Sequence, residues 1–372
     1  MRFLHIADLH LGMMLNGVSL IEEQAHALDQ IRSIIREERI DGILLAGDIF
    51  DRAVSNAETI LLYDRFLTAL RTEERVTVFI IAGNHDGGAR LAQLSDILAS
   101  ADIHISGILT EKPKLIPFGD TEVCMIPYFH MDQVRLLYPD LQLQSVNDAM
   151  KALIDDIKAR RAPDKKTIVT AHCFVNGSHL SESDIGARLG GASLIGADVF
   201  NGIDYTALGH LHRMQHPADR VWYAGSLYPY SFSEGEKYAL IYDSIADTVQ
   251  PVPLYPRHKL RTITGTHDEM RRIAEKDPNR DDYIQIILTD GSADLETQEY
   301  FRARYPRLIM ILSALEAAES SISLTHEELR SIAPDELLIR FCKETAGYEP
   351  DQNEIEEFLE ALQAVQSEGE LQ

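Results

Sequence analysis

The sequence predicts an α/β protein whose first two thirds alternate buried strands with amphipathic helices. Runs such as Gly42–Ala46 and Val76–Ala82 are apolar almost without interruption, which is typical of strands buried on both faces. Between such runs lie segments with apolar residues at helical spacing. Because strands alternate with helices, we expect an α/β sheet covered by helices. The two expected helix faces consist of Ile21, Leu28, Ile31 and Ile35, and of Leu61, Leu62, Phe66 and Leu70.

Later strand-like segments follow one another with no helix between them. The runs at 220–224, 238–243 and 248–254 predict an antiparallel meander, so we expect mixed sheets. A smaller series of strand, helix, strand, helix and strand follows. We therefore expect three parts: a main domain at 1–257, a small α+β domain at 258–320, and C-terminal helices at 321–372.

The expected C-terminal helices carry an apolar stripe that consists of Ile355, Phe358, Leu359, Leu362 and Val365. Such stripes more often pack inside their own chain than against a partner. This one follows two complete domains and stands in a segment, 349–370, that is rich in acids and has no Lys or Arg. An intramolecular core and a surface for a partner protein both remain open.

The composition, 45% apolar and 25% charged, is that of an ordinary soluble protein. No apolar run is long enough to cross a membrane, and the N-terminal segment lacks the pattern of a signal peptide. Cys124, Cys173 and Cys342 are scattered, which suits a reducing compartment and gives no thiolate zinc site. We therefore expect a cytoplasmic protein without a membrane partner.

The net charge of −24 argues against a protein that binds DNA through a basic surface. Two features of the chain reduce the weight of this charge. Bound divalent cations can invert the local field at a site. In addition, part of the acidity is concentrated in the C-terminal segment, far along the chain from the strands and helices of the main domain.

Metal-capable side chains follow five of the expected strands. In α/β domains, sites form at the carboxyl ends of the strands. Asp8 and His10 are two residues apart, as are His210 and His212, so each pair shares one face of an extended chain. Carboxylate, imidazole and amide ligands favour Mn²⁺, with Fe²⁺ or Zn²⁺ as alternatives. The candidate metal ligands are Asp8, His10, Asp48, Asn84, His172, His210 and His212.

This set is large enough for two metal ions if one carboxylate bridges them. Two divalent cations can activate water and neutralise the oxygens of a phosphate ester, so the set indicates a phosphoesterase. His85, next to Asn84, is then available as the acid or electrostatic donor for the leaving oxygen. A single histidine at a strand end is usually an ordinary hydrogen-bonded residue, and we expect this of His5, His104, His130, His179, His216 and His267.

Five short motifs resemble, in order and spacing, those of the calcineurin-like metallophosphoesterases. They are Asp8-Leu9-His10, Gly47-Asp48-Ile49-Phe50-Asp51, Gly83-Asn84-His85-Asp86, Ala171-His172 and Gly209-His210-Leu211-His212. The resemblance implies a four-layer sandwich of two mixed sheets between helices, with His85 as the catalytic histidine. It also implies one metal ion held by Asp8, His10, Asp48 and His212, and a second held by Asp48, Asn84, His172 and His210.

A narrower resemblance, to the SbcD family of bacterial DNA nuclease subunits, covers essentially the whole chain. It adds His172-Cys173-Phe174-Val175, Gly225-Ser226 and Tyr230-Ser231-Phe232-Ser233. The family implies a Mn²⁺-dependent endonuclease on single-stranded DNA, which becomes an ATP-dependent exonuclease on double strands with an SbcC-like coiled-coil ATPase. It implies work in DNA repair, recombination and replication, including hairpin processing. It also implies C-terminal helices that dock on the ATPase and a homodimer within a heterotetramer.

The chain departs from that family pattern at two positions. Leu227 stands where proline is common, and Asp51 stands where archaeal and eukaryotic relatives often have a second functional histidine. Asp51 is therefore either part of the site or only a cap for the following helix. The sequence contains no GxxxxGK[ST] pattern, so any ATP-driven step requires another subunit.

Two other function classes remain open. A phosphatase of the same superfamily, acting on phosphoproteins or small phosphate esters, would usually differ at three motif positions, which here are Leu11, Ala53 and Asp86. A metal-free scaffold on the same fold would be marked by lost ligands, and all seven candidates are present.

Overall fold

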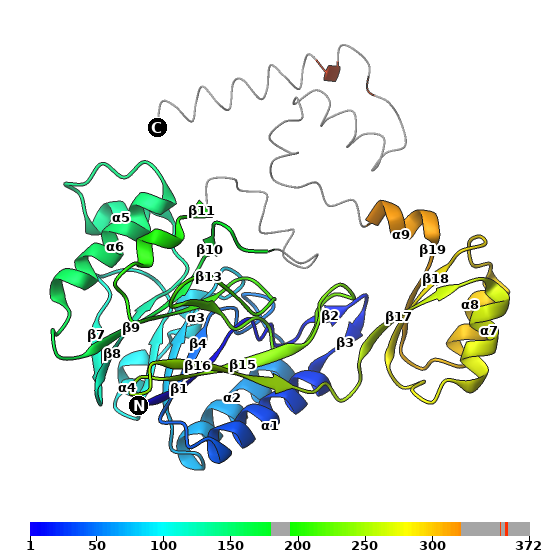
Figure 1. Cartoon of the computed structure of the whole chain (residues 1–372), viewed down its shortest axis with the longest axis horizontal. Helices are drawn as coiled ribbons and strands as arrows, with labels where there is room; N and C mark the ends of the chain where they lie inside the picture. The colour runs from blue at the N-terminus through cyan, green and yellow to red at the C-terminus, as the bar shows by residue number, and fades with distance from the viewer. Residues whose placement is uncertain (180–193, 321–349, 351–353, 356–372) are drawn as a thin grey trace. The chain divides into compact units, whose positions relative to one another are not determined.

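The structure, a computed structural model, describes residues 1–179, 194–320, 350 and 354–355 (Figure 1). The chain divides into two compact units, Met1–Ala314 and Leu315–Gln372. Among the described residues, no helix is both long and apolar enough to span a membrane. The expected C-terminal helices, Cys342 and all of the apolar stripe except Ile355 lie outside the described residues.

The first sheet has six strands in the order β16-β15-β1-β4-β5-β6. Its four strands β1, β4, β5 and β6 are parallel, and β15 and β16 add an antiparallel hairpin next to β1. The strands are β1 (Arg2–Ile6), β4 (Gly42–Ala46), β5 (Thr77–Ile81), β6 (Ile103–Ser106), β15 (Lys237–Asp243) and β16 (Thr248–Leu254).

The second sheet also has six strands, in the order β13-β14-β12-β9-β8-β7. Its four central strands are parallel, and each edge strand is antiparallel to its neighbour. The strands are β7 (Leu115–Phe118), β8 (Thr121–Ile126), β9 (Lys166–His172), β12 (Tyr205–Gly209), β13 (Gln215–Ala218) and β14 (Val221–Tyr223).

The predicted meander is therefore wrong. β14 lies parallel to β12 in the second sheet, whereas β15 and β16 form a hairpin in the first sheet. Residues 224–236 carry the chain from one sheet to the other. Strands of both sheets bury apolar side chains in the same way, so the pattern within a strand does not reveal which sheet it joins.

Helices cover the outer faces of both sheets, and the two sheets pack against each other. Phe3 and Phe79 of the first sheet share one buried cluster with Ile168 and Tyr205 of the second. Separate clusters join each sheet to its own helices. The predicted four-layer α/β fold is confirmed. The first sheet is covered by α1 (Ile21–Glu37) and α2 (Ala57–Thr72), and the second by α5 (Met131–Leu137) and α6 (Val146–Arg160).

The expected face of α1 is buried at Leu28, Ile31 and Ile35. On α2, in contrast, Leu61 is 58% exposed, so its assignment to the inner face was wrong.

The shorter elements of this part are β2 (Met14–Leu15), β3 (Val18–Ser19), α3 (Gly88–Leu91), α4 (Ser95–Ala99), β10 (Phe174–Val175), β11 (Leu194–Ile195) and the 3₁₀ helix η2 (Ala197–Phe200).

A small three-stranded sheet follows, with two helices packed on it. Met270 and Phe301 from the helices bury against Ile286 of the central strand. All three strands are parallel, so this part is an α/β domain. The sequence predicted the same order of strands and helices but classed the domain as α+β. The boundary at 257/258 stays a prediction. The elements are β17 (Leu260–Gly265), α7 (His267–Lys276), β18 (Tyr283–Leu288), α8 (Leu295–Arg302) and β19 (Leu308–Ser313), and α9 (Ala314–Ser320) follows.

His5 of β1 joins the two sheets through polar contacts inside the core. Its Nε2 lies 3.0 Å from the carbonyl oxygen of Leu208, and its Nδ1 lies 2.9 Å from the hydroxyl of Tyr205. Because a carbonyl only accepts, Nε2 carries the proton and Nδ1 accepts from Tyr205. Burial lowers the pKa of His5 to about 3, so the side chain is neutral. His5 is the ordinary core histidine that we expected.

His5 should make folding stability depend on pH. Its folded-state pKa lies below the ordinary value of 6.5, so as the pH falls the unfolded chain binds the proton first. Stability that is present above pH 6.5 is therefore lost progressively towards pH 3. In urea unfolding with a metal chelator, the advantage of wild type over His5→Gln should shrink by about 2 kcal/mol between pH 7 and pH 5. Parallel pH dependences of the two proteins would refute this account.

Candidate metal centre

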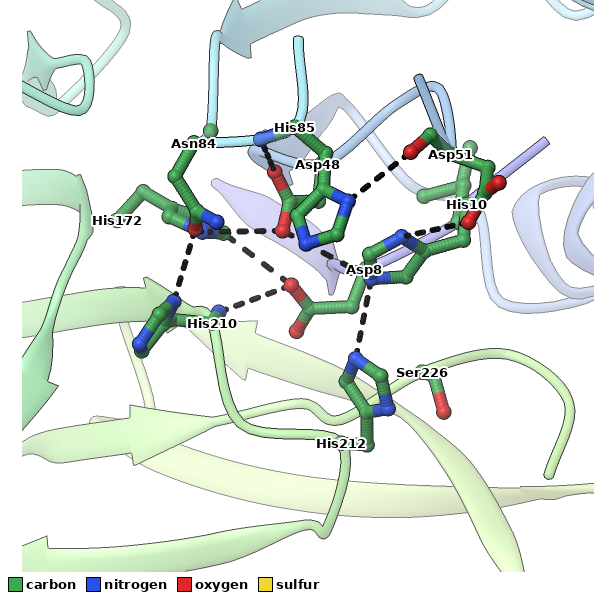
Figure 2. Close-up of polar contacts among 12 residues, drawn as sticks. Asp8, His10, Asp48, Asp51, Asn84, His85, His172, His210, His212 and Ser226 are labelled. Carbon is green, nitrogen blue, oxygen red and sulfur yellow. Dashed lines mark hydrogen bonds and ion pairs between the residues drawn. The ribbon is translucent and has the colours of Figure 1, made fainter. Parts of the chain in front are cut away.

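All seven candidate ligands and His85 converge where strands of the two sheets end (Figure 2). Asp8 and His10 follow β1, and Asp48 follows β4. Asn84 and His85 follow β5, also in the first sheet. The second sheet supplies the remaining three, which are His172 at the end of β9, and His210 and His212 after β12. Their roles as ligands stay a prediction, but the structure brings them together.

The backbone at this junction is unusual. Asp8, His10 and Asp48 have φ values of 51°, 40° and 49°, in the left-handed region that most residues avoid. Backbone strain of this kind persists where surrounding contacts impose it, often at functional sites. The approach of the chains is also close, because a Cβ on Gly209 would lie 1.9 Å from the carbonyl oxygen of Ala46. Only glycine allows the two sheets to meet at this point.

The carboxylate of Asp48 lies at the middle of the group. Its Oδ1 accepts a hydrogen bond of 2.8 Å from the backbone N–H of His85. Its Oδ2 lies 3.3 Å from Nε2 of His172 and 3.7 Å from Nε2 of His10. Burial alone would raise the pKa of Asp48, but the facing imidazoles hold that pKa well below its usual range. The side chain therefore presents a carboxylate to donors from both sheets.

The buried side chains of Asp8, His10 and His212 lie next to one another. The Oδ1 atom of Asp8 accepts from the backbone N–H of His210, at 2.9 Å. Its Oδ2 has no hydrogen-bond partner among the described residues. Nε2 of His10 lies 3.0 Å from Nε2 of His212. Burial raises the pKa of Asp8 to about 7 and lowers that of His10 to about 3. The neutral imidazole of His10 and the buried oxygens of Asp8 and Asp48, with ligand atoms within 4.8 Å of one another, fit a divalent cation.

A second set of donors lies around Asn84. Its side-chain oxygen lies 3.0 Å from Nε2 of His172 and 3.0 Å from Nδ1 of His210. The other nitrogen of His172, Nδ1, donates to the carbonyl oxygen of Ala46 at 2.8 Å. This contact fixes the ring so that Nε2 faces the site. The described residues thus supply nitrogen and oxygen donors from both sheets, which are candidates for the metal site of a phosphoesterase.

His85 lies at the exposed rim of the group. Its Nδ1 lies 2.9 Å from the backbone oxygen of Asp51, and its ring meets that of His10 edge-on at 4.8 Å. The side chain of Asp51 lies 3.9 Å from Nδ1 of His10. Asp51 is not the cap of α2, because Asn56 accepts the hydrogen bond from Thr59 there. Of the two roles left open for Asp51, the structure supports a place in the site.

Asp86 joins two of the loops that carry the candidate ligands. Its carboxylate accepts hydrogen bonds of 2.9–3.1 Å from the backbone N–H groups of Ile49, Phe50 and Gly83. The loops that carry Asp48 and Asn84 are therefore tied to one anchor. The sequence placed Asp86 in a motif but did not predict this structural role.

Gln24 and Tyr230 hold the loop that carries Asp8 and His10. The side chain of Gln24 accepts from the N–H of Gly12 at 2.9 Å and donates to the carbonyl of His10 at 2.7 Å. The hydroxyl of Tyr230 donates to the carbonyl of Leu9. Tyr230 belongs to a motif noted in the sequence, whereas no sequence pattern marked Gln24.

The neighbours of these two residues hold the start of the small domain. Glu23 accepts from the backbone N–H groups of Arg257 and His258, each at 3.2 Å, and lies 2.5 Å from Nδ1 of His258. The hydroxyl of Tyr228 donates to the carbonyl of His258 at 2.9 Å. Two short segments thus contact both the candidate site and the connection to the small domain.

Two protein families match this chain in sequence. The calcineurin-like phosphoesterase family matches residues 1–214, and the family described as type 5 capsule protein repressor C-terminal domain matches residues 256–346. The SbcD subunit of the nuclease SbcCD from Staphylococcus saprophyticus subsp. saprophyticus is 25% identical over 379 residues, which cover 99% of this chain and 100% of that relative.

Solved structures also match, at greater distance. A crystal structure of a protein from Thermus thermophilus has a TM-score of 0.42 and 13% identity, and covers 68% of this chain and 99% of its own. A dimetal phosphatase from Danio rerio has a TM-score of 0.36 and 13% identity, with 64% and 91% covered. Similarity at this level is too low to bear on function.

Proposed function

We propose that this chain, which belongs to the calcineurin-like phosphoesterases and within them to the SbcD-family nuclease subunits, cuts DNA at a two-metal centre. The observation that carries the proposal is the position of Asp48, whose carboxylate lies between imidazoles from both sheets. A bridging carboxylate with donors on both sides is what a pair of divalent ions requires. The full-length similarity to a nuclease subunit favours DNA over a small phosphate ester as the substrate.

The proposed ligands fall into two sets that share Asp48. One set is Asp8, His10, Asp48 and His212, and the other is Asp48, Asn84, His172 and His210. Oxygen and imidazole donors without a thiolate favour Mn²⁺ as the metal. When bound, two such ions would activate water and neutralise the charge that develops on the phosphate oxygens.

His85 is proposed as the catalytic residue at the leaving oxygen. Since the backbone oxygen of Asp51 only accepts, Nδ1 of His85 carries a proton in their 2.9 Å contact. This contact fixes the ring and leaves Nε2 free to hold or deliver a proton to the substrate. The exposed position of His85 at the rim is where a substrate strand would pass.

An ATPase partner is the second part of the proposal. The relative from Staphylococcus saprophyticus is named as one subunit of a nuclease complex. This chain has no phosphate-binding loop pattern of its own. We propose that an SbcC-like coiled-coil ATPase supplies the ATP-driven step, that residues 321–372 dock on it, and that the complex acts on DNA in the cytoplasm.

The proposed homodimer would use an exposed apolar surface on α2 and α4. Ile60 and Leu61 on α2 are 48% and 58% exposed, and Leu94 and Ile97 at α4 are 62% and 66% exposed. The two helices contact β5 and β6, which are neighbours in the first sheet. Exposed large apolar side chains on helices that cover adjacent strands favour a protein partner, and a second copy of this chain is the partner that we propose.

The isolated chain should cut single-stranded circles with Mn²⁺, cut blunt duplex poorly, and ignore ATP. An intact duplex is too stiff to present one phosphodiester to a recessed site, whereas a single strand can bend into it. Adding the ATPase should make digestion of duplex ends ATP-dependent. Faster hydrolysis of nitrophenyl phosphate than of DNA would favour the phosphatase alternative.

Asp48→Asn should remove cutting and much of the bound metal, while the circular dichroism spectrum stays unchanged.

His85→Gln should separate catalysis from metal binding. We expect both metal ions and most DNA affinity to remain, while the cutting rate falls roughly 10²–10⁴-fold, the usual range for loss of a general acid or base. The measurements are metal content by mass spectrometry and single-turnover cutting rates. A parallel loss of metal and rate would make His85 a ligand instead.

Leu61→Asp combined with Ile97→Asp should convert the proposed dimer to a monomer, because each change places a charge in an apolar contact. Sedimentation velocity gives the oligomeric state. Leu136→Asp is a matched control, since Leu136 on α5 is 82% exposed over the other sheet. A wild-type monomer, or a dimer that survives the double change, would show that this surface does not join two copies.

A further inference from the structure

A buried ion pair lies directly behind His212. One ring nitrogen of His212, Nε2, lies 3.0 Å from His10, and the other, Nδ1, lies 3.5 Å from Oε1 of Glu234. Oε2 of Glu234 pairs with the ammonium of Lys237. The side chains of Glu234 and Lys237 are only 1% and 5% exposed. His212 therefore lies between the candidate metal ligands and a buried charged pair.

The same group holds the backbone of His212. The ammonium of Lys237 donates to the carbonyl oxygen of His212 at 2.8 Å and to the hydroxyl of Ser226 at 2.7 Å. The backbone N–H of Ser226 donates to the same carbonyl at 3.2 Å. Gly225 has a φ of +79°, and a Cβ there would lie 2.6 Å from that carbonyl, so glycine permits the approach. Ring and backbone of His212 are thus fixed by one cluster.

The stability of the fold does not explain this arrangement. Burying two charges costs free energy that their attraction often fails to recover, and apolar replacements of a buried pair are frequently neutral or stabilising. A carboxylate beside the outer nitrogen of a metal-binding histidine, in contrast, fixes the tautomer and strengthens the inner nitrogen as a donor. The free-energy cost of burying Glu234 and Lys237 is therefore better explained by their contacts with His212 than by a contribution to folding stability.

We propose that Glu234, Lys237 and Ser226 are positioning residues that orient His212 and strengthen it as a ligand, an inference that rests on the proposed two-metal centre. Glu234 holds the proton on Nδ1, so that the lone pair of Nε2 faces the site. His172, in the other proposed ligand set, is oriented by the neutral carbonyl of Ala46 instead. The two metal positions therefore differ, and only the one that uses His212 depends on Glu234.

The test is a titration of metal-free full-length protein with Mn²⁺, by calorimetry and equilibrium dialysis. Wild type should bind two ions. Glu234→Gln should bind one ion with unchanged affinity and the other roughly 10–100-fold more weakly. Saturating Mn²⁺ should restore the kcat of Glu234→Gln, while the Mn²⁺ concentration for half-maximal rate rises by a similar factor.

Glu122→Gln is the matched control. Glu122 is also a buried carboxylate, on β8, and its Oε1 accepts from the N–H of Ala162 at 3.1 Å and from the hydroxyl of Thr167 at 3.2 Å. Because these contacts lie away from the candidate ligands, both Mn²⁺ affinities should stay at the wild-type values.

A double variant guards against a simple loss of folding. Glu234→Gln with Lys237→Met removes both charges, so the metal-free protein should melt near wild type. The same single metal position should still be weakened. Two Mn²⁺ ions bound with wild-type affinity by both variants would overturn the positioning role. A wild-type protein that binds no Mn²⁺ would instead overturn the two-metal centre, and the inference with it.

Discussion

The carboxylate of Asp48 joins the two sheets at the point where the candidate site forms. One of its oxygens accepts from the backbone of His85 in the first sheet, and the other faces His172 of the second. The close contact of Gly209 with Ala46 and the buried hydrogen bonds of His5 keep the sheet ends at this separation. The sandwich is therefore required for the chemistry, since neither sheet alone presents both sets of donors.

Local patterns in the sequence were enough to predict an α/β fold and the residues that meet at the strand ends, and the family resemblance added the four layers. A buried strand followed by Asp48 or by His172 is visible within a few residues, and parallel strands necessarily end at one edge. The pairing of β14 was missed because its partner strand is chosen by contacts across the molecule. Leu61 was misplaced because a helical stripe does not reveal how wide the buried face is.

Residues that support the candidate ligands were the hardest to predict. Gln24, Glu234 and Lys237 contact the site from distant parts of the chain, and in the sequence each is an ordinary polar residue. Their burial is what distinguishes them, and burial of a polar side chain is a property of the folded protein. The net charge of −24 says little about the site for a similar reason, because it averages over the chain, whereas the site has its own local field.

Two pairs of residues, Glu23 with Gln24 and Tyr228 with Tyr230, couple two parts of the chain mechanically. In each pair the first residue forms a hydrogen bond with His258, at the start of the small domain. The second forms a hydrogen bond with the loop that carries Asp8 and His10. The two contacts of each pair are only one or two residues apart along the chain. A rotation of the small domain about His258 would therefore be transmitted directly to the strained loop, because no flexible linker lies between the two contacts.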